Sequence, residues 1–281
     1  MEVAAALETD LVLRLRAAGC VFAEDEARLL VTQASSESEL AAMVDRRVSG
    51  LPLEQVLGWA EFGGLRMHVE PGVFVPRRRT ELLVDTAAEL CRPRAVVVDM
   101  CCGTGAVAAA LLARCPTVEV HAVDIDPVSV RCARLNVRGP RGQVYEGDLF
   151  QPLPARLRGD VDMVVANAPY VPTRAIASMP PEARLHESHV ALDGGIDGLD
   201  VQRLIVDEAC GWLAAGGMLL IETSEQQAEH TAALMRHRGM RTTVVRSDDL
   251  DATVVTGALV DADGSVRSLA RSDDAVGPSG P

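Results

Sequence analysis

Hydrophobic positions in the first fifty residues recur every three or four residues, the spacing of an amphipathic helix. In the first segment these positions are Leu7, Leu11, Leu15 and Ala18. In a second segment, at about 24–33, they are Ala27, Leu30 and Val31. A third helix is predicted to begin after Ser36, where Glu39 completes a capping box, and to end near Gly50. The pattern therefore predicts a small helical domain over residues 1–52.

A different pattern follows the helical segments. Residues 55–75 contain two short β-like runs, several glycines and the turn Pro71-Gly72, which predict a β-hairpin linker over residues 53–76. From residue 95, short apolar runs alternate with amphipathic segments. Strands are predicted at 96–99, 119–124, 143–146, 161–166, 218–222, 240–246 and 252–260. Helices are predicted at 80–91, where Thr80 is the expected cap, and at 106–114, 127–137, 199–214 and 225–237.

The alternation of strands and helices predicts a doubly wound sheet with right-handed crossovers. No helix separates the last two predicted strands, so one strand is expected to be antiparallel. The fold class is therefore α/β: a Rossmann-like, seven-stranded, mostly parallel sheet with one antiparallel strand, in a domain over residues 77–261. The Pro- and Gly-containing segment 170–198 is predicted as a long loop, and loops of that length usually carry function. Residues 262–281 are predicted to form a disordered tail.

Charge and composition exclude several functions. The 281 residues include 27 basic and 40 acidic side chains, giving a net charge of −13, and all 27 basic residues are Arg. Without lysine, the chain can contain neither a Schiff-base lysine nor a P-loop lysine. The acidic balance disfavours nucleic acid as a direct substrate, because such binding rests on neutralised phosphates. Seven Cys without a Cys-x-x-Cys pair indicate reduced thiols and no metal site.

The cellular location is predicted from what the N-terminal region lacks. It holds the acids Glu2, Glu8 and Asp10 without a basic flank, so no signal peptide is predicted. No apolar run approaches the ~20 residues that cross a bilayer. We therefore expect a cytoplasmic protein with no membrane partner, while the sequence leaves the oligomeric state undetermined.

Acidic side chains stand at three successive strand ends. The first strand leads through Asp99 into V-V-D-M-C-C-G-T-G-A (97–106), where Gly103 and Gly105 let the backbone approach a ligand closely. Asp99 is suited to bind a cationic ammonium, although a tight strand-to-helix turn without a ligand is the alternative. Asp124 is suited to grip ribose hydroxyls, and its alternative is a solvated capping acid.

The third strand end is E-G-D-L-F (146–150). Here Asp148 is suited to accept a hydrogen bond from an adenine amino group, while Leu149 packs on the ring. Asp126, by contrast, is predicted to cap the helix that follows it. Together, the three strand ends predict a site for a nucleoside that carries an amino acid.

The fourth strand ends in A-N-A-P-Y (166–170), the most specific motif in the chain. Asn-Pro-Pro-Tyr at this position is typical of S-adenosylmethionine-dependent methyltransferases that modify a planar amide or amino nitrogen. Among these, the chain resembles the HemK/PrmC family of protein N5-glutamine methyltransferases. Three more segments resemble that family: S-G-L-P-L-E-Q-V-L-G-W-A-E-F (49–62), F-V-P-R-R-R-T-E (74–81) and H-E-S-H-V-A-L-D-G-G-I-D-G-L (186–199). The resemblance extends over about residues 40–260.

The resemblance implies a cofactor, a substrate and a set of site residues. The cofactor is S-adenosylmethionine, and the substrate is a protein that bears the target glutamine, for which a translation release factor is the best single choice. Besides Asp99, the implied cofactor contacts are Cys101, Cys102, Gly103, Thr104, Gly105, Asp124, Asp148, Leu149 and Asn167. The residues implied to hold the glutamine amide and to serve catalysis are Asn167, Ala168, Pro169 and Tyr170, with Glu187 as a further substrate contact.

The chemistry of an amide agrees with this interpretation. An amide nitrogen is a poor nucleophile because its lone pair is delocalised into the carbonyl. Two acceptors aimed at its two N–H groups orient that lone pair toward a sulfonium methyl group. The Asn167 side-chain oxygen and the Ala168 carbonyl are suited to be these acceptors. Catalysis is then expected to rest on positioning rather than on a strong base.

The chain departs from the family pattern at several positions. Ala168 stands where the family has Pro, so we expect a slower or altered site that keeps its carbonyl acceptor. Cys101 stands in place of a Gly, and we expect it to adopt ordinary backbone angles with its side chain beside the methionine part of the cofactor. Other departures are Arg78 and Ser188 in place of Pro, D-A-T at 251–253 in place of Asn-x-Arg, and a helical domain shorter by one or two helices.

Alternatives stay open at the level of sequence. The enzyme could methylate another planar nitrogen, such as adenine N6 of nucleic acid or a small-molecule amide or amine, or it could be a non-catalytic cofactor-binding module. The turn Arg77-Arg78-Arg79 is predicted to be solvated, with contact to an acidic partner or to the cofactor carboxylate as the alternative. We expect His121 to be packed in its strand.

Overall fold

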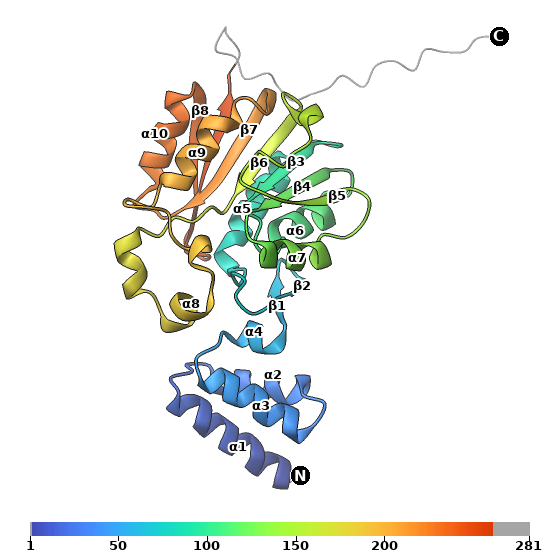
Figure 1. Ribbon diagram of the computed structural model, residues 1–281, viewed down its shortest axis with the longest axis vertical. Coiled ribbons are helices and arrows are strands. Elements are labelled where there is room, and N and C mark those ends of the chain that lie inside the picture. The colour runs from blue at the N-terminus through green and yellow to red at the C-terminus, as the bar shows by residue number, and fades with distance from the viewer. Residues whose placement is uncertain (1, 261–281) are drawn as a thin grey trace, which may run out of the picture.

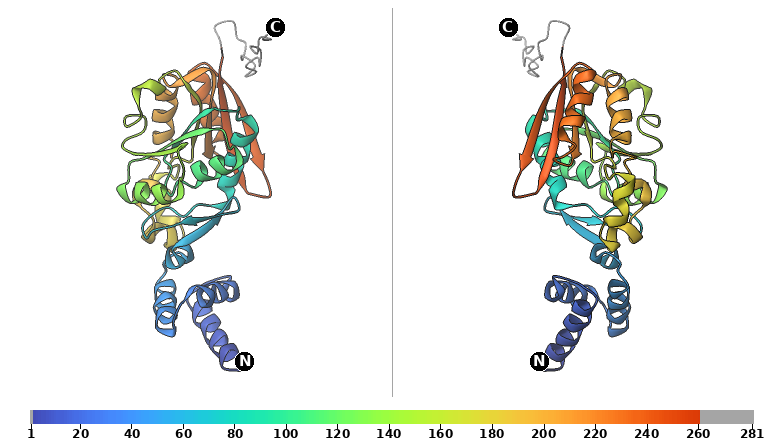
Figure 2. Two further views of the ribbon diagram at one scale, coloured as in Figure 1. Left: turned by 90° about the vertical axis from the view of Figure 1, so that its right-hand side faces the viewer. Right: turned by 90° about the vertical axis from the view of Figure 1, so that its left-hand side faces the viewer.

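The computed structural model describes residues 2–260, and the side chains from residue 9 onward. Figures 1 and 2 show an elongated molecule with the N-terminal helices at one end and an α/β domain at the other. The predicted tail at 262–281 lies outside the described residues. Within the described residues, no helix has the length and apolar character needed to cross a membrane.

The N-terminal unit consists of four helices: α1 (Glu2–Ala17), α2 (Ala23–Gln33), α3 (Glu37–Val48) and α4 (Leu53–Leu57). Their buried faces meet in a small core that includes Leu11, Leu15 and Leu30. Ser36 caps α3 by accepting a hydrogen bond from the Glu39 N–H, as predicted.

Two predicted core positions in these helices are wrong. Ala18 follows the end of α1 and is exposed, and Val31 is 43% exposed. Glu26 occupies the buried face of α2 instead. It forms an ion pair with the buried Arg47 of α3, a partnership that hydrophobic spacing does not reveal.

The linker contains the predicted hairpin. Strands β1 (Trp59–Phe62) and β2 (Leu65–His68) pair antiparallel. The short 3₁₀ helix η1 (Arg78–Thr80) then leads into α5 (Glu81–Leu90). Thr80 stands at the start of α5, but its side chain makes no capping hydrogen bond, so its predicted role is wrong. Its hydroxyl accepts a hydrogen bond from the Asn167 side chain instead.

The central sheet has the order β5-β4-β3-β6-β7-β9-β8. Its strands are β3 (Val96–Met100), β4 (Glu119–Asp124), β5 (Gly142–Glu146), β6 (Val161–Ala166), β7 (Leu213–Thr223), β8 (Met240–Ser247) and β9 (Ala252–Leu259). Strand β9 runs antiparallel to both of its neighbours, and the other described pairs in this sheet are parallel. The predicted fold class is therefore confirmed.

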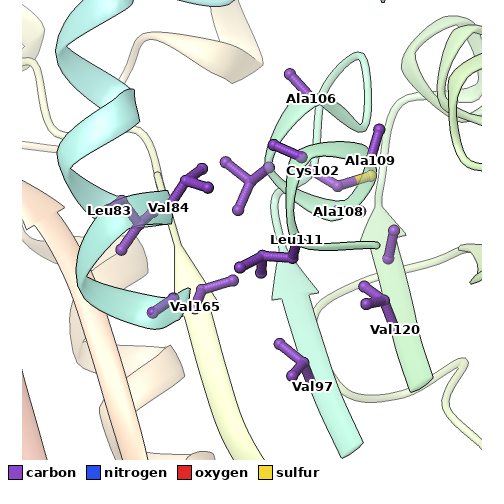
Figure 3. Close-up of a cluster of buried hydrophobic side chains, with 14 of the residues drawn as sticks. Leu83, Val84, Val97, Cys102, Ala106, Ala108, Ala109, Leu111, Val120 and Val165 are labelled. Carbon is purple, nitrogen blue, oxygen red and sulfur yellow. The ribbon is translucent and has the colours of Figure 1, made fainter. Parts of the chain in front are cut away.

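Helices cover both faces of the sheet (Figure 1). On one face, α5, α6 (Ala106–Arg114) and α7 (Pro127–Asn136) contribute to one apolar core. Figure 3 shows this core around α5 and α6, where Leu83 and Val84 lie near Leu111 and Val165. On the other face, α9 (Asp200–Ala209) and α10 (Ala228–His237) contribute to a second core. Small aliphatic side chains fill most of both cores, in keeping with a chain that is only 3% aromatic.

The start of β7 differs from the prediction. A helix was expected to run to residue 214, but α9 ends at Ala209 and β7 begins at Leu213. The pairing of β7 with β6 shifts register between Leu213 and Met218. Gly216, at φ +75°, lies within that irregularity. A bulge of this kind lets the strand continue past the two glycines that the sequence presented as a turn.

The segment predicted as one long loop contains short helices. They are η3 (Thr173–Ser178), α8 (Pro181–His186) and η4 (His189–Ala191), and a further short helix, η2 (Ala155–Leu157), precedes β6. Isolated bridges join Gly72 to Glu187 and Val171 to Asp193. The segment is thereby held against both the linker and the end of β6.

Candidate active site

A cavity of about 250 Å³ opens at the carboxyl ends of β3, β4 and β6. The order of the sheet places its switch point there, because the chain leaves β3 toward β4 on one side and later adds β6 on the other. The predicted site residues that line the cavity are Asp99, Cys101, Cys102, Gly103, Thr104, Asp124, Asp148, Leu149, Asn167, Ala168, Pro169, Tyr170 and Glu187. Folding thus brings together residues from five separate segments of the chain.

Gly105 is the one predicted site residue that does not line the cavity. It has φ +73°, and a Cβ atom there would lie 2.8 Å from Val137 Cγ2 and 3.0 Å from Ala133 Cβ. Glycine at this position therefore lets the turn pack closely against α7 and its C-terminal end.

The turn after β3 has an unusual backbone at Cys101. Its φ is +58°, so the expectation of ordinary backbone angles is wrong. Gly103 and Gly105 are also left-handed, at φ +54° and +73°. The turn requires this conformation because the chain reverses from strand to helix within a few residues, and a Cys side chain adopts it under strain.

Asp99 lies at the inner wall of the cavity and is 1% exposed. Its Oδ2 accepts a hydrogen bond of 3.0 Å from the Ala108 N–H in the first turns of α6. Burial, together with the charge of the nearby Asp124, raises the pKa of Asp99 to about 7 against the opposing effect of the Ala108 hydrogen bond. A carboxyl in this position is stabilised in its charged form by a cationic ligand.

Asp124 is anchored by the backbone around it. Its two oxygens accept hydrogen bonds from the N–H groups of Gly103, at 2.8 Å, and Asp126, at 2.9 Å. Burial raises the pKa of Asp124, and these hydrogen bonds lower it. Asp126 caps α7 through the N–H groups of Val128 and Ser129, as predicted.

The turn after β5 presents Asp148 and Leu149 to the cavity. Leu149 is 9% exposed and has φ +44°, a left-handed conformation that the sequence gave no sign of. Gly147 precedes it, and a Cβ atom there would lie 2.8 Å from Pro152. The close approach of Pro152 therefore restricts position 147 to glycine.

The motif Asn167–Tyr170 follows β6 directly. Asn167 donates a hydrogen bond from Nδ2 to Thr80 Oγ1 at 3.2 Å, and Ala168 is 1% exposed. The Tyr170 carbonyl accepts a hydrogen bond from the Gln227 side chain at 3.0 Å. Burial and the charge of Glu222 raise the pKa of the Tyr170 phenol to about 12.

Glu187 joins the 170–198 segment to the linker. Its Oε1 accepts from the Val75 N–H at 3.3 Å and from the Arg77 guanidinium at 2.5 Å. Burial raises the pKa of Glu187, and the charge of Arg77 opposes this. Arg77 also stacks over Phe74, so the expectation of a solvated arginine turn is wrong for this residue.

Glu222 was not singled out by the sequence analysis. Glu222 lies near the end of β7 and is 1% exposed. Arg79 lies 3.6 Å from it, Nε to Oε1, and its guanidinium is 5.9 Å from the centre of the Tyr170 ring. A charged residue within the apolar run 218–222 was the available signal, since a carboxyl in a central strand is seldom fully buried.

Known proteins resemble this chain along most of its length. It is 39% identical over 231 residues to the release factor glutamine methyltransferase of Mycolicibacterium smegmatis, covering 80% of this chain and 82% of that protein. The chain belongs to the release factor glutamine methyltransferase family, HemK/PrmC. A second family member, from Geobacter sulfurreducens, is 39% identical over 208 residues and is matched over 72% of each chain. The family model of the methyltransferase small domain matches residues 64–195.

Solved structures agree in fold. A methyltransferase from Pyrococcus furiosus has a TM-score of 0.53 at 13% identity, covering 78% of this chain and 98% of that chain.

Membership of the HemK/PrmC family confirms the predicted family, and with it the prediction of an S-adenosylmethionine-dependent methyltransferase. The cavity at the switch point of the sheet is accordingly the candidate active site of this enzyme.

Proposed function

We propose that this enzyme methylates the side-chain amide nitrogen of a glutamine in a translation release factor. The observation that carries the proposal is the position of Asn167–Tyr170, in the wall of the same cavity as the three acidic strand ends. Relatives at 39% identity are release factor glutamine methyltransferases. The seven free cysteines suit a reducing compartment, so we place the reaction in the cytoplasm.

The residues of the cavity fit S-adenosylmethionine, which supplies an activated methyl group on a sulfonium when it is bound. Asp99 is a buried carboxyl with one oxygen free of a described hydrogen bond, and it suits the ammonium group. Each Asp124 oxygen already accepts one backbone hydrogen bond and keeps a further lone pair for a ribose hydroxyl. Asp148 and Leu149 are in place to contact the adenine.

The turn after β3 completes the proposed cofactor contacts. Cys101, Cys102, Gly103 and Thr104 line the cavity between Asp99 and Asp124. Burial raises the pKa of both thiols, so Cys101 and Cys102 stay neutral and act as walls of the site rather than as nucleophiles.

The glutamine amide is held by two acceptors in this proposal. The Nδ2 of Asn167 is bound to Thr80, which leaves Oδ1 to accept one N–H of the substrate. The Ala168 carbonyl accepts the other N–H, and Pro169 favours extended backbone angles at Ala168 even though the family's first Pro is replaced. With both N–H groups held by Asn167 and Ala168, the orientation of the amide nitrogen and its lone pair is fixed. Bound S-adenosylmethionine would supply its methyl group to this nitrogen as the S–CH₃ bond breaks, and the nitrogen would release one proton to solvent.

Tyr170 and Glu187 support the bound amide. The Tyr170 phenol, with a pKa of about 12, is uncharged at neutral pH and offers a planar surface rather than a base. Glu187 lies in the cavity wall and fixes the 170–198 segment to the linker through Val75 and Arg77. In this proposal Glu187 acts by holding the 170–198 segment, which forms part of the cavity wall, in place.

The proposal is tested by incubating the enzyme with labelled S-adenosylmethionine and a translation release factor, then locating the label by mass spectrometry. We expect N5-methylglutamine in the wild-type reaction and no methylation with Asn167→Ala. Arg114→Ala, which removes an ion pair with Asp85, is the control and is expected to retain full activity, because neither residue lines the cavity. Full activity of Asn167→Ala, or a label on another residue type, contradicts the proposal.

A further inference from the structure

Arg79 is a cavity residue to which the proposed function gives no part. It belongs to the turn of three arginines at 77–79, of which Arg77 and Arg79 line the cavity and Arg78 does not. Arg77 is held by a hydrogen bond to Glu187. The Arg79 side chain is 44% exposed, so its N–H donors are within reach of a ligand.

The charge partner of Arg79 is a buried carboxyl. Arg79 Nε lies 3.6 Å from Glu222 Oε1, and the Glu222 side chain is 2% exposed. Neither Glu222 oxygen has a hydrogen-bond partner among the described residues, so the pair attracts by charge without a formed hydrogen bond. A guanidinium that only neutralised Glu222 would gain most by being buried and hydrogen-bonded beside it. Arg79 is neither, which indicates that its donors serve a second partner.

Arg79 lies on the side of Asn167 that faces away from the proposed cofactor residues. The sheet has the order β3-β6-β7 here, so Asn167, directly after β6, stands between Asp99 on β3 and Glu222 on β7. Arg79 contacts Glu222, and its guanidinium also lies 5.9 Å from the centre of the Tyr170 ring. Both contacts belong to β7 and to the segment after β6, not to β3 or β4.

The methyl acceptor occupies this side during transfer. In an in-line displacement the sulfur, the methyl group and the attacking nitrogen lie on one line, so the rest of the acceptor lies beyond the nitrogen. A polypeptide acceptor brings backbone carbonyls on both sides of the target glutamine and, where its sequence has them, carboxylate side chains. A guanidinium presents five N–H donors in a planar fork, which suits either kind of oxygen acceptor.

We propose that Arg79 is a substrate-binding residue, which donates hydrogen bonds to a carboxylate or backbone carbonyl oxygen of the polypeptide beside its target glutamine. Attraction to Glu222 keeps the guanidinium at the end of β7, beside the ring of Tyr170. The contact is made equally before and during methyl transfer, so it lowers KM and leaves kcat unchanged. This inference rests on the proposed function, because it assumes a protein acceptor held at Asn167.

Kinetics with a translation release factor test the proposal at about pH 8, because burial raises the pKa of Glu222 to about 7 and the carboxyl must be charged. Arg79→Met is expected to raise the KM for the release factor about tenfold and to leave kcat within about twofold of the wild type. Arg79→Lys keeps the charge without the fork and is expected to give an intermediate KM. Arg78→Met removes the neighbouring exposed arginine outside the cavity and, as the matched control, is expected to keep the wild-type KM.

A double variant separates substrate binding from neutralisation of Glu222. Arg79→Met leaves the buried carboxyl without its counter-charge, whereas Arg79→Met/Glu222→Gln removes both charges. We expect the double variant to keep the raised KM, because the donors to the substrate are still missing. A KM that returns to the wild-type value would show that Arg79 only neutralises Glu222, and would overturn the proposal. If Arg79→Met does not fold, comparison of the double variant with Glu222→Gln supplies the same measurement.

Calorimetry with S-adenosylmethionine tests the alternative that Arg79 binds the carboxylate of the cofactor. The affinity is expected to be the same in the wild type, in Arg79→Met and in Arg78→Met. An affinity that is lower in Arg79→Met alone would assign Arg79 to the cofactor and overturn the proposal.

Salt distinguishes the two kinds of oxygen acceptor. If the acceptor is a carboxylate, the ratio of the KM of Arg79→Met to that of the wild type falls as salt rises from about 0.05 to about 0.5 M, because exposed charges are screened. If the acceptor is a backbone carbonyl, the ratio changes little. Equal KM values for the two enzymes at the lower salt concentration overturn the proposal.

Labelling of a cell extract separates failure of this inference from failure of the proposed function. If the wild type methylates a release factor and Arg79→Met has the same KM, only the inference fails. If the wild type labels another protein of the extract instead, the proposed function fails, and the two enzymes are compared on that protein at limiting concentration. Weaker labelling by Arg79→Met then supports the inference, and equal labelling overturns it. If the wild type labels no protein at all, both fail.

Discussion

Cys101 occupies a left-handed backbone position that glycine adopts without strain. A non-glycine residue at φ +58° is disfavoured by roughly 1–2 kcal/mol, while glycine loses about 0.5–1 kcal/mol through the entropy of the unfolded chain. Cys101→Gly is therefore expected to leave the melting temperature unchanged or to raise it slightly. Cys102, which is 8% exposed and has no positive φ, is the matched control, and Cys102→Gly is expected to destabilise. Thermal unfolding of both variants checks this, and the reverse order contradicts it.

Asp99 links stability to pH in the ligand-free enzyme. Its pKa is raised from 3.8 to about 7, so between these values the folded state binds more protons than the unfolded state. Stability is therefore expected to fall as pH rises through this window. Asp99→Asn removes the titration, so the variant is expected to be more stable than the wild type by about 1–4 kcal/mol above neutral pH. The difference is expected to shrink toward pH 4.

Denaturant unfolding at several pH values measures this difference in stability. Calorimetry with S-adenosylmethionine measures the effect of the same substitution on cofactor affinity. Asp99→Asn is expected to bind the cofactor at least tenfold more weakly, about 1.4 kcal/mol, because a neutral amide does not attract an ammonium group. A variant that is less stable than the wild type above neutral pH would contradict the electrostatic explanation.

At the scale of elements, a buried arginine joins the N-terminal helices to the 170–198 segment. Arg47 of α3 makes a bidentate contact with Glu26 of α2 at 2.6 and 3.1 Å, and it contacts Glu182 of α8 at 2.7 Å. Gln55 of α4 adds hydrogen bonds to the carbonyls of Val73 and His186, both at 3.1 Å. These contacts hold α8 against the helical unit.

Removing one partner of this buried pair leaves the other charge uncompensated. Arg47→Met is therefore expected to destabilise the protein by about 3–5 kcal/mol. The double variant Glu26→Met/Arg47→Met removes both charges and is expected to recover much of the loss. Chemical denaturation of the two variants decides the matter, and a double variant less stable than Arg47→Met would contradict the explanation.

Most elements of the α/β domain could be predicted from the sequence. Strands β4 and β6 and helix α6 match their predicted bounds because each is a short apolar run or an Ala/Leu-rich segment between turn residues. The start of β7 could not be predicted, since L-A-A at 213–215 suits a helix as well as a strand. The pairing of β7 with β6 makes this segment a strand, and that pairing joins residues that are far apart in the chain.

For the whole molecule, the absence of lysine makes a chemical prediction. Since every basic residue is Arg, an amine-acylating reagent finds no lysine side chain. Treatment with such a reagent is expected to leave methyl transfer unchanged, whereas arginine-directed dicarbonyl reagents are expected to inhibit, because Arg77 and Arg79 line the cavity. Activity assays before and after treatment, with intact mass as the measure of modification, check both. Inhibition by the amine reagent would show that a different amine takes part.

The sequence by itself determined the fold class, the family resemblance and the motifs at four strand ends. These are local properties: hydrophobic periodicity and short motifs are fixed by neighbouring residues. Only the tertiary structure decided which other residues lie beside those motifs. Glu222 lies beside Asn167 because β6 and β7 pair in parallel, and Thr80, which precedes α5, forms a hydrogen bond with Asn167. Likewise, the left-handed backbone at Cys101 follows from the reversal of the chain between β3 and α6, and the pairing of Arg47 with Glu26 follows from how the helices pack.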